Sequence, residues 1–181
     1  MHTADDVLRF WFVEHDKDDW FGGKADFDAE LASQFSETHA SVARGEAWAW
    51  RKTPAGMLAE IIVLDQFSRQ LHRGSPEAFA QDKMALVLAQ GAIAAGADQA
   101  LDPVRRAFFY LPLMHSESLV IQDEGVRLYQ ALGDADQLDF MRKHRAVIEK
   151  FGRFPFRNKA LGRQSTPEEI AYMKAQGDSM F

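Results

Sequence analysis

The sequence predicts an all-α fold of about eight helices, arranged as antiparallel hairpins in a single domain over residues 1–181. Apolar residues recur with a period near 3.6, and no stretch alternates with period 2 for long enough to make a strand. Four of the six prolines directly follow a residue type that caps helix starts: Thr53, Ser75, Asp102 and Thr166. Short connections between the helices favour antiparallel neighbours.

The N-terminal half contains three long predicted helices. A helix over about residues 26–44 has an apolar face formed by Phe27, Leu31, Phe35 and Val42. A helix over about residues 54–72 has one face formed by Leu58, Ile61, Ile62, Asp65 and Arg69. A helix over about residues 76–95 has an apolar face formed by Phe79, Leu86 and Ile93.

The C-terminal half contains four predicted helices, over about residues 103–110, 116–132, 135–151 and 167–176. Pro112 lacks an N–H group, so it predicts a helix end or kink, and the next helix is predicted to start near Ser116. Thr166 and Glu169 form a capping box at the start of the last helix. The two long predicted loops span residues 13–25 and 152–165.

Composition excludes several classes of protein. The chain is 46% hydrophobic and 27% charged, as is typical of globular domains. It has no cysteine, which excludes disulfides, thiolate metal sites and a cysteine nucleophile, and fits a reducing, cytoplasmic location. No signal peptide or membrane span is predicted. A net charge of −6 argues against general affinity for nucleic acid. Metalloprotease, P-loop and dinucleotide-binding motifs are absent, so no metal and no cofactor are predicted.

Basic residues are concentrated near the C-terminus. The window 142–163 holds eight basic residues and one acid, although acids outnumber basic residues in the chain, 27 to 21. Part of this window, 152–158, reads Gly-Arg-Phe-Pro-Phe-Arg-Asn and fits neither helical nor strand periodicity. Positive charge gathered in one irregular segment indicates an anionic partner.

Three segments combine polar groups with aromatic residues. In the first, Asp65 and Arg69 are four residues apart and pair on one helical face. This pair either fixes helix packing or orients Arg69 toward a ligand. In the second, His115 and Glu117 lie at the predicted start of a helix, where they serve as capping groups or as an acid/base pair that binds an anion.

The third segment begins on the helix before the irregular stretch and runs through it. Its candidate ligand-binding residues are His144, Arg145, Arg153, Arg157 and Asn158. Arginine offers a planar pair of donors that suits carboxylate or phosphate. Phenylalanines alternate with these charges, so the stretch either presents its arginines to a cleft or is a solvated basic loop held down by its rings.

With these segments identified, the chain resembles a bacterial family, domain-of-unknown-function family 924. The matching stretches are LDQFSR (64–69), FFYLPLMHSE (108–117) and FGRFPFRNKALGRQSTPEE (151–169). The resemblance implies a tetratricopeptide-like right-handed superhelical stack, and it implies no activity. The family pattern commonly has histidine where this chain has Phe156, which weakens a catalytic reading of the third segment and leaves its anion-binding reading intact.

Three functional hypotheses follow. The first is a polar pocket that binds a small anionic molecule, a phosphate or a carboxylate. If catalysis occurs there, His115 is the acid/base candidate and Glu117 or Asp65 orients it. The second is a helical scaffold that receives an acidic peptide or protein and has no catalytic activity. In the third, the polar groups clamp the C-terminal segment onto the helices.

Overall fold

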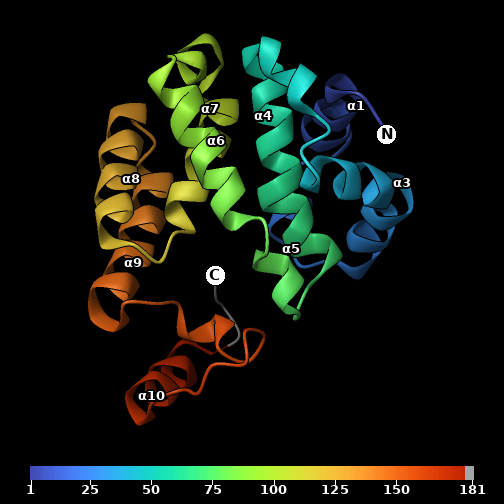
Figure 1. Ribbon diagram of the computed structural model, residues 1–181. Helices are drawn as coiled ribbons and strands as arrows, with labels where there is room; N and C mark the ends of the chain where they lie inside the picture. Colours follow the sequence, from blue (N-terminus) through green and yellow to red (C-terminus); the bar gives the residue numbers. More distant parts are fainter. Residues whose placement is uncertain (178–181) are drawn as a thin grey trace. The chain divides into compact units, whose positions relative to one another are not determined.

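The computed structural model describes residues 1–177, and every regular element within that range is a helix (Figure 1). The all-α prediction is therefore confirmed. The chain divides into two compact units. Unit 1 comprises Met1–Arg73 and Glu77–Pro112, and unit 2 comprises Gly74–Pro76 and the described residues from Leu113 onward. That the whole chain behaves as a single domain stays a prediction.

The α-helices that lie wholly or mostly in unit 1 are α1 (Ala4–Arg9), α2 (Lys17–Trp20), α3 (Ala25–Ala43), α4 (Pro54–Ile62), α5 (Ser68–Leu71), α6 (Asp82–Ala94) and α7 (Pro103–Met114). Two π-helical turns interrupt them, η1 (Phe10–Glu14) and η3 (Val63–Phe67). The 3-10 turns are η2 (Trp48–Lys52), η4 (Pro76–Phe79) and η5 (Ala97–Ala100). Unit 2 contains α8 (Leu119–Leu132), α9 (Ala135–Phe151), the 3-10 turn η6 (Pro155–Arg157) and α10 (Pro167–Gln176).

Aromatic rings from both π-helical turns form part of the core of unit 1. The ring centres of Phe10 and Trp11, in η1, lie 6.2 and 5.6 Å from that of Phe67 in η3. Phe35 of α3 lies 5.3 Å from the same ring. All four side chains are at most 1% exposed. Because each buried ring contributes about 1.5–3 kcal/mol, this contact fixes η3 against η1 and α3.

The helix predicted over residues 54–72 is three consecutive elements, α4, η3 and α5. Thr53 starts it as predicted, because its side chain accepts a hydrogen bond from the backbone N–H of Gly56. Leu58, Ile61 and Ile62 are buried, as their spacing predicts. The prediction of a regular α-helix is wrong at 63–67, where the backbone forms the wider π-helical turn η3. Such turns occur often at functional sites.

The helix α6 buries smaller side chains than expected. The sequence predicts an apolar face of Leu86 and Ile93, but both are only half-buried. The buried residues are Ala85, Ala89 and Ala92, which share one face. α6 packs against α4, and alanines let two helix backbones approach closely. The helix also begins later than predicted, because the first part of the predicted range, 76–79, is the 3-10 turn η4.

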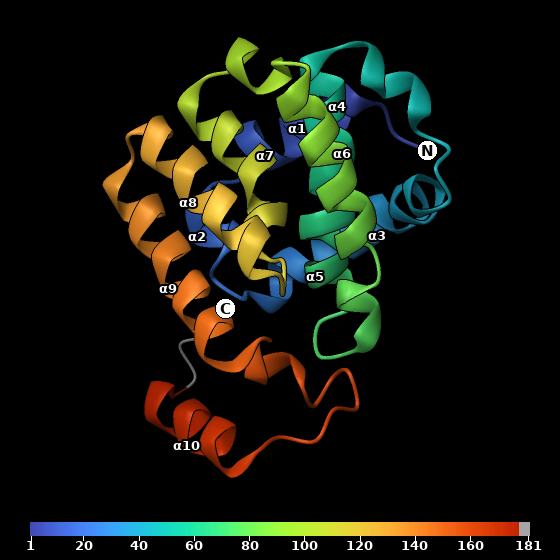
Figure 2. The same ribbon diagram turned by 60° about the vertical axis from the view of Figure 1, so that its left-hand side comes forward.

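In unit 2, α8 and α9 form an antiparallel hairpin and lie side by side in Figures 1 and 2. Gly133, with φ of +83°, ends α8 in the left-handed conformation that glycine adopts readily. The Asp134 side chain then accepts hydrogen bonds from the backbone N–H groups of Asp136 and Gln137. The Asp134 cap explains why α9 begins where predicted. Both α9 and α10 have their predicted bounds.

Gly125 lies on α8 against the buried side chain of Met141 on α9. A Cβ atom at Gly125 would lie 2.8 Å from both Sδ and Cε of Met141. We expect Gly125→Leu to lower the free energy of unfolding by about 1–3 kcal/mol, because it overpacks this contact. Urea denaturation measures the change. The control is Gly91→Leu on α6, where an added Cβ meets nothing within 4 Å. An equal loss in both variants would contradict the packing argument.

Two boundary predictions near Pro112 are wrong. α7 continues through Pro112 and ends at Met114, so the helix does not end near residue 110. The missing N–H removes one helical hydrogen bond, and the helix extends only two residues further. α8 begins at Leu119 after Ser118 as its N-cap, so Glu117 precedes the helix instead of lying in its first turn. The predicted loop 13–25 also contains α2.

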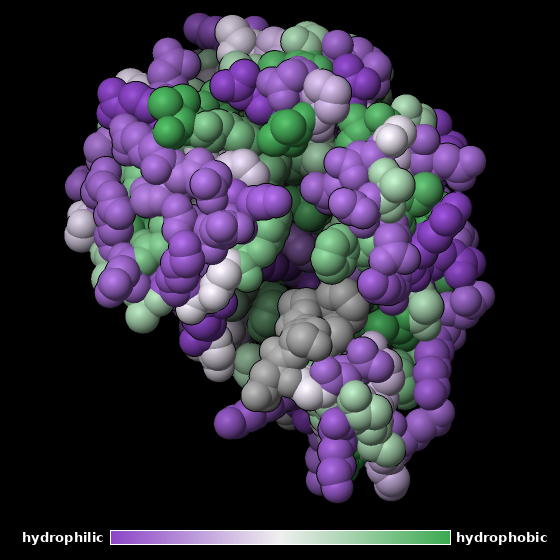
Figure 3. All heavy atoms as spheres, turned by 180° about the vertical axis from the view of Figure 1, so that it is seen from behind, coloured by the Kyte–Doolittle hydropathy of each residue, from purple (hydrophilic) through white to green (hydrophobic). Residues whose placement is uncertain are grey.

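The face shown in Figure 3 is mainly hydrophilic. On the face shown in Figure 3, hydrophobic residues lie among hydrophilic ones. The large hydrophobic residues that are more than half exposed include Val13, Phe21, Trp48, Val120 and Phe140. Among residues 1–177, none of the helices combines the length and apolar character needed to span a bilayer.

Candidate functional site

In unit 1, the predicted pair of Asp65 and Arg69 is present and has a third member. Arg69 Nη1 lies 3.1 Å from Asp65 Oδ1 and 2.9 Å from Asp82 Oδ1. Arg69 Nη2 donates to Asp82 Oδ2 at 3.1 Å, and the guanidinium lies over the ring of Phe79. Asp65 is 1% exposed. Arg69 thus joins η3 to the first turn of α6.

Burial favours loss of the proton from Arg69, but the carboxylates of Asp65 and Asp82 outweigh it and raise the pKa of Arg69 above its usual range. Arg69 therefore stays charged and holds both acids. This geometry agrees with a structural ion pair. A role for Asp65 and Arg69 in binding a ligand stays a prediction.

In unit 2, the turn between α7 and α8 carries His115 and Glu117. Gln122 of α8 is fully buried, and its side-chain amide nitrogen donates to the carbonyl oxygens of Met114 and Ser116, both at 2.7 Å. These bonds occupy carbonyl groups at the end of α7 and just beyond it, which have no partner within the helix. Gln122 therefore fixes the short turn that presents His115 and Glu117.

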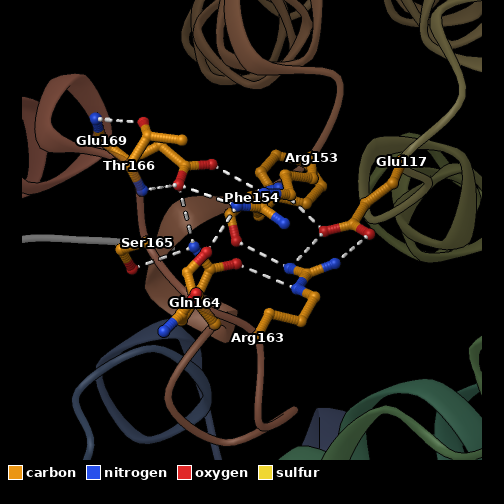
Figure 4. A network of polar contacts seen from close by, with 9 residues as sticks. Glu117, Arg153, Phe154, Arg163, Gln164, Ser165, Thr166 and Glu169 are labelled. Atoms are coloured by element: carbon orange, nitrogen blue, oxygen red, sulfur yellow. Dashed lines mark hydrogen bonds and ion pairs between the residues drawn. The ribbon is translucent and has the colours of Figure 1, made fainter.

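Glu117 binds the C-terminal segment and does not cap a helix. Its two carboxylate oxygens lie 2.7 and 2.9 Å from Nη1 and Nη2 of Arg163, and its Oε1 also accepts from the backbone N–H of Phe154 at 2.8 Å. Arg163 additionally donates to the carbonyl of Phe154 and to Oδ1 of Asn158. Figure 4 shows Arg163 lying between Glu117 and Phe154.

A second ion pair holds the other side of the same segment. Arg153 Nε and Nη2 donate to the carboxylate oxygens of Glu169 at 2.7 and 2.9 Å. Glu169 also accepts from Asn158 Nδ2 and from the backbone N–H of Thr166, which completes the predicted capping box of α10 (Figure 4). Glu169 is 2% exposed and Asn158 1%. Arg153 and Asn158 therefore lie together, as a support for the loop 152–166.

Both carboxylates stay ionised in the folded chain. Burial alone would raise the pKa of Glu117, but hydrogen bonds from Arg163 and from the Phe154 N–H outweigh it and lower that pKa. The hydrogen bond from Arg153 is the main reason that the pKa of Glu169 falls to about 2. Each of these acids therefore neutralises an arginine. This is the arrangement that the clamp hypothesis predicts for Arg153 and Arg163.

Arg145 lies on the α8–α9 hairpin and pairs with two acids. Its Nε lies 2.6 Å from Asp123 on α8, and its Nη1 lies 2.9 Å from Glu149 on its own helix. These contacts raise the pKa of Arg145. The contacts connect the two helices of the hairpin, and a ligand-binding role for Arg145 stays a prediction.

Two predicted residues, Arg157 and His144, lie against the ring of Phe154, which is 3% exposed, and a third, His115, lies beside His144. The Arg157 guanidinium carbon lies 4.4 Å from the centre of this ring, and the imidazole of His144 lies 5.6 Å from it. The imidazole of His115 is 6.4 Å from that of His144. We call His115, His144, Phe154 and Arg157 the histidine–arginine cluster. It combines a permanent cation with two imidazoles.

Phe156 of the irregular segment is half-buried. Its ring lies 6.3 Å from Tyr172 on α10. Phe151 lies 5.1 Å from the same tyrosine. The rings of this segment thus pack in part against α10, as the alternation of phenylalanine and charge suggests.

Sequence reasoning missed four residues that hold these groups in place: Asp82, Gln122, Arg163 and Glu169 as the partner of Arg153. Glu169 was visible as a capping residue, but nothing in the spacing shows that it also binds Arg153. Glu117 and Arg163 are 46 positions apart, so no local pattern joins them. Among residues 1–177, no group of three or more histidine or acidic side chains is arranged to hold a metal ion.

Comparisons with known proteins agree with this architecture. Residues 7–177 match a family model described as "Bacterial protein of unknown function (DUF924)". A solved structure, of a protein of unknown function, ATU0120, from Agrobacterium tumefaciens, is 38% identical, with a TM-score of 0.91 over 95% of this chain and 97% of that one. A search of curated proteins found no match. The chain belongs to the DUF924 family of bacterial proteins of unknown function.

Proposed function

We propose that the chain binds a small anionic molecule, a phosphate or a carboxylate, at the histidine–arginine cluster of unit 2. The observation that carries the proposal is the placement of Arg157 and His144 against one buried ring, with the imidazole of His115 6.4 Å from that of His144. A guanidinium suits a carboxylate or phosphate because its donors lie in one plane. Imidazoles add donors or acceptors beside it.

In this proposal Arg153 and Arg163 have a structural role, and Arg157 binds the ligand. Arg153 and Arg163 each hold a carboxylate with two hydrogen bonds, so they fix the loop that carries Arg157. Arg157 lies over Phe154, and the Phe154 backbone is bound by Glu117. The clamp thus supports the site. Arg145 and Asn158, also predicted to bind the ligand, lie in the same unit, whereas the predicted ligand-binding role of Asp65 and Arg69 concerns unit 1.

The proposal also includes the predicted superhelical arrangement, the cytoplasmic location and a possible catalytic role for His115. A tetratricopeptide-like superhelical stack needs antiparallel helical hairpins, and α8 with α9 supplies one. A cytoplasmic location is supported by the absence of cysteine. If the bound molecule is also converted, His115 is the proposed acid/base group. The carboxylate of Glu117 already binds Arg163 and the Phe154 backbone, so Glu117 acts as a positioning residue in this proposal.

Thermal unfolding with increasing concentrations of inorganic phosphate and of carboxylates tests the proposal. We expect the wild-type midpoint to rise with ligand concentration, because an anion that binds only the folded state stabilises it. Arg157→Gln is expected to weaken binding by about tenfold or more, which corresponds to about 1.4 kcal/mol or more. Lys159→Gln is the control, since it removes one positive charge from an exposed position two residues further along.

The result that contradicts the proposal is equal ligand stabilisation of Arg157→Gln and the wild type, or no stabilisation of the wild type by any anion in the panel. Circular dichroism of each variant without ligand shows whether it is folded, so a loss of binding can be separated from a loss of structure.

A further inference from the structure

A cavity of about 160 Å³ lies within unit 1, between α6 on one side and η2 with α4 on the other. A protein cavity of about 150 Å³ with apolar walls is large enough to bind benzene, so this one has room for an apolar group of about six carbon atoms. Its lining combines apolar side chains with one ion pair and includes Met57, Val87, Leu88, Gly91, Arg51 and Glu60.

Two glycines shape this cavity. A Cβ atom at Gly56 would clash with the carbonyl oxygen of Trp50, so the absence of a side chain there lets η2 pack closely on α4. Gly91 lines the cavity from α6, and a Cβ atom at that position would meet nothing within 4 Å. Glycine is a poor residue for a helix interior. A larger side chain at position 91 would therefore fill the cavity without weakening the helix.

The ion pair in the lining has one buried and one exposed member. Glu60 is 1% exposed, and its two carboxylate oxygens accept from Nε and Nη2 of Arg51, both at 2.7 Å. The Arg51 side chain is 39% exposed. A guanidinium has further N–H donors, including both of those on Nη1. Among residues 1–177, Nη1 of Arg51 has no hydrogen-bond partner, so Glu60 fixes a guanidinium that can still donate to a ligand.

The charges at this cavity favour an anionic ligand over a cationic one. Arg51 neutralises Glu60, and Lys52, the next residue in the chain, adds a positive charge at an exposed position. Both oxygens of Glu60 are already bound by Arg51 and shielded from solvent. A ligand that enters from solvent therefore meets the donors of Arg51 and not the Glu60 carboxylate.

We infer that this cavity of unit 1 is a second binding site, for a small aliphatic carboxylate. The hydrocarbon tail lies among Met57, Val87 and Leu88, and the carboxylate accepts hydrogen bonds from the outer donors of Arg51. Arginine suits this task because its donors lie in one plane and match a carboxylate. The inference uses residues of unit 1 alone, so it does not rest on the function proposed for the histidine–arginine cluster.

NMR titration of the whole chain, with ¹³C in the methionine methyl groups, tests the inference with butyrate, hexanoate and hexanol. Hexanoate is expected to bind more tightly than butyrate by about fourfold for each added methylene, because the tail is buried. It is expected to bind about tenfold more tightly than hexanol, which gives Arg51 no charged acceptor. The methyl signal of Met57 should shift, whereas that of Met141, which lies in unit 2, should not.

Two variants separate the tail from the carboxylate. Gly91→Leu fills the cavity and is expected to weaken hexanoate binding by about tenfold or more. Its matched control is Gln90→Leu, which adds the same side chain at an exposed position of α6 and should bind hexanoate as the wild type does. Arg51→Gln combined with Glu60→Gln removes both charges without leaving a buried carboxylate unpaired. This double variant is expected to bind hexanoate and hexanol equally.

Three results would overturn the inference: no shift of the Met57 signal with hexanoate, equal affinity for butyrate and hexanoate, or tighter binding of hexylamine than of hexanoate. The last of these would mean that Glu60 selects a cation. Each of them is measured on the wild type, so the decision does not depend on the folding of a variant. Arg157→Gln, which tests the site in unit 2, should leave the hexanoate titration of Met57 unchanged, so either proposal can fail without the other.

Discussion

Glu169→Ala is expected to lower the free energy of unfolding of unit 2 by about 2–3 kcal/mol, because hydrogen bonds to charged groups contribute more than neutral ones. Glu169 is almost completely buried and accepts hydrogen bonds from Arg153, Asn158 and the Thr166 backbone. Its loss removes the ion pair together with one half of the capping box of α10, the hydrogen bond from the Thr166 N–H. Arg153 is partly exposed and regains water, which keeps the expected loss below that of a fully buried pair.

Hydrogen exchange of backbone amides in residues 113–177 measures this change within unit 2. The matched control is Glu168→Ala, one residue earlier in the same helical turn. The Glu168 side chain is 69% exposed and pairs with Lys150 at 3.3 Å. Exposed pairs contribute about 0–1 kcal/mol, so the control should change little. Similar losses of unfolding free energy in both variants would contradict this prediction. They would mean that the hydrogen bonds of Glu169 contribute no more than any acid at this end of the helix.

The helix boundaries that sequence predicted correctly are those set by local caps. α9 begins after Asp134 and ends before Gly152, and α10 begins after Thr166. In each case one side chain or one glycine satisfies backbone groups within a few residues, so the signal is contained in the local sequence. Pairs at helical spacing are equally local, and the pairing of Asp65 with Arg69 was predictable for this reason.

The features that sequence missed depend on packing between distant segments. The π-helical turn at 63–67 keeps its apolar residues buried, so the hydrophobic pattern does not distinguish it from a regular helix. α6 packs against α4, and its buried face consists of alanines, although Leu86 and Ile93 are the more hydrophobic residues. Both features depend on packing against a neighbouring element, so the spacing of residues in the local sequence does not predict them.

In the candidate site, too, local features were predictable from sequence and contacts between distant segments were not. Sequence located the basic segment and named Arg153, Arg157 and His144, because charge and irregular structure coincide there. It could not show that Arg153 and Arg163 bind acids, because those acids, Glu169 and Glu117, come from other elements. The partners of these two arginines therefore follow from tertiary contacts alone.

Unit 1 is expected to lose roughly 2–3 kcal/mol of stability as the pH falls from about 6.5 to about 4, because His39 is held neutral in the folded chain. His39 is 7% exposed, and its Nε2 lies 2.8 Å from Oγ of Ser68. The Ser68 hydroxyl donates to the carbonyl of Leu64, so the imidazole Nε2–H donates to that hydroxyl. Burial, with a smaller contribution from the charge of His72, lowers the pKa of His39 to about 4.

The direction of the pH effect follows from proton binding. In the unfolded chain His39 has an ordinary pKa near 6.5, so between that value and about 4 the unfolded state binds a proton that the folded state does not. Acid therefore favours unfolding, and the contribution of His39 is fully present above pH 6.5. Glu169 acts in a lower range, since its pKa falls from 4.5 to about 2, and its stabilisation is lost only as the pH passes below about 4.5.

Tryptophan fluorescence during urea denaturation measures the effect in unit 1 specifically, because all four tryptophans of the chain, Trp11, Trp20, Trp48 and Trp50, lie there. His39→Gln keeps an N–H donor for Ser68 but cannot take up a proton, so it should flatten the stability curve between pH 6.5 and 4. His2→Gln, at an exposed position of the same unit, is the control for the loss of an imidazole. A curve for His39→Gln that falls as steeply as the wild type would show that other groups cause the acid sensitivity of this unit.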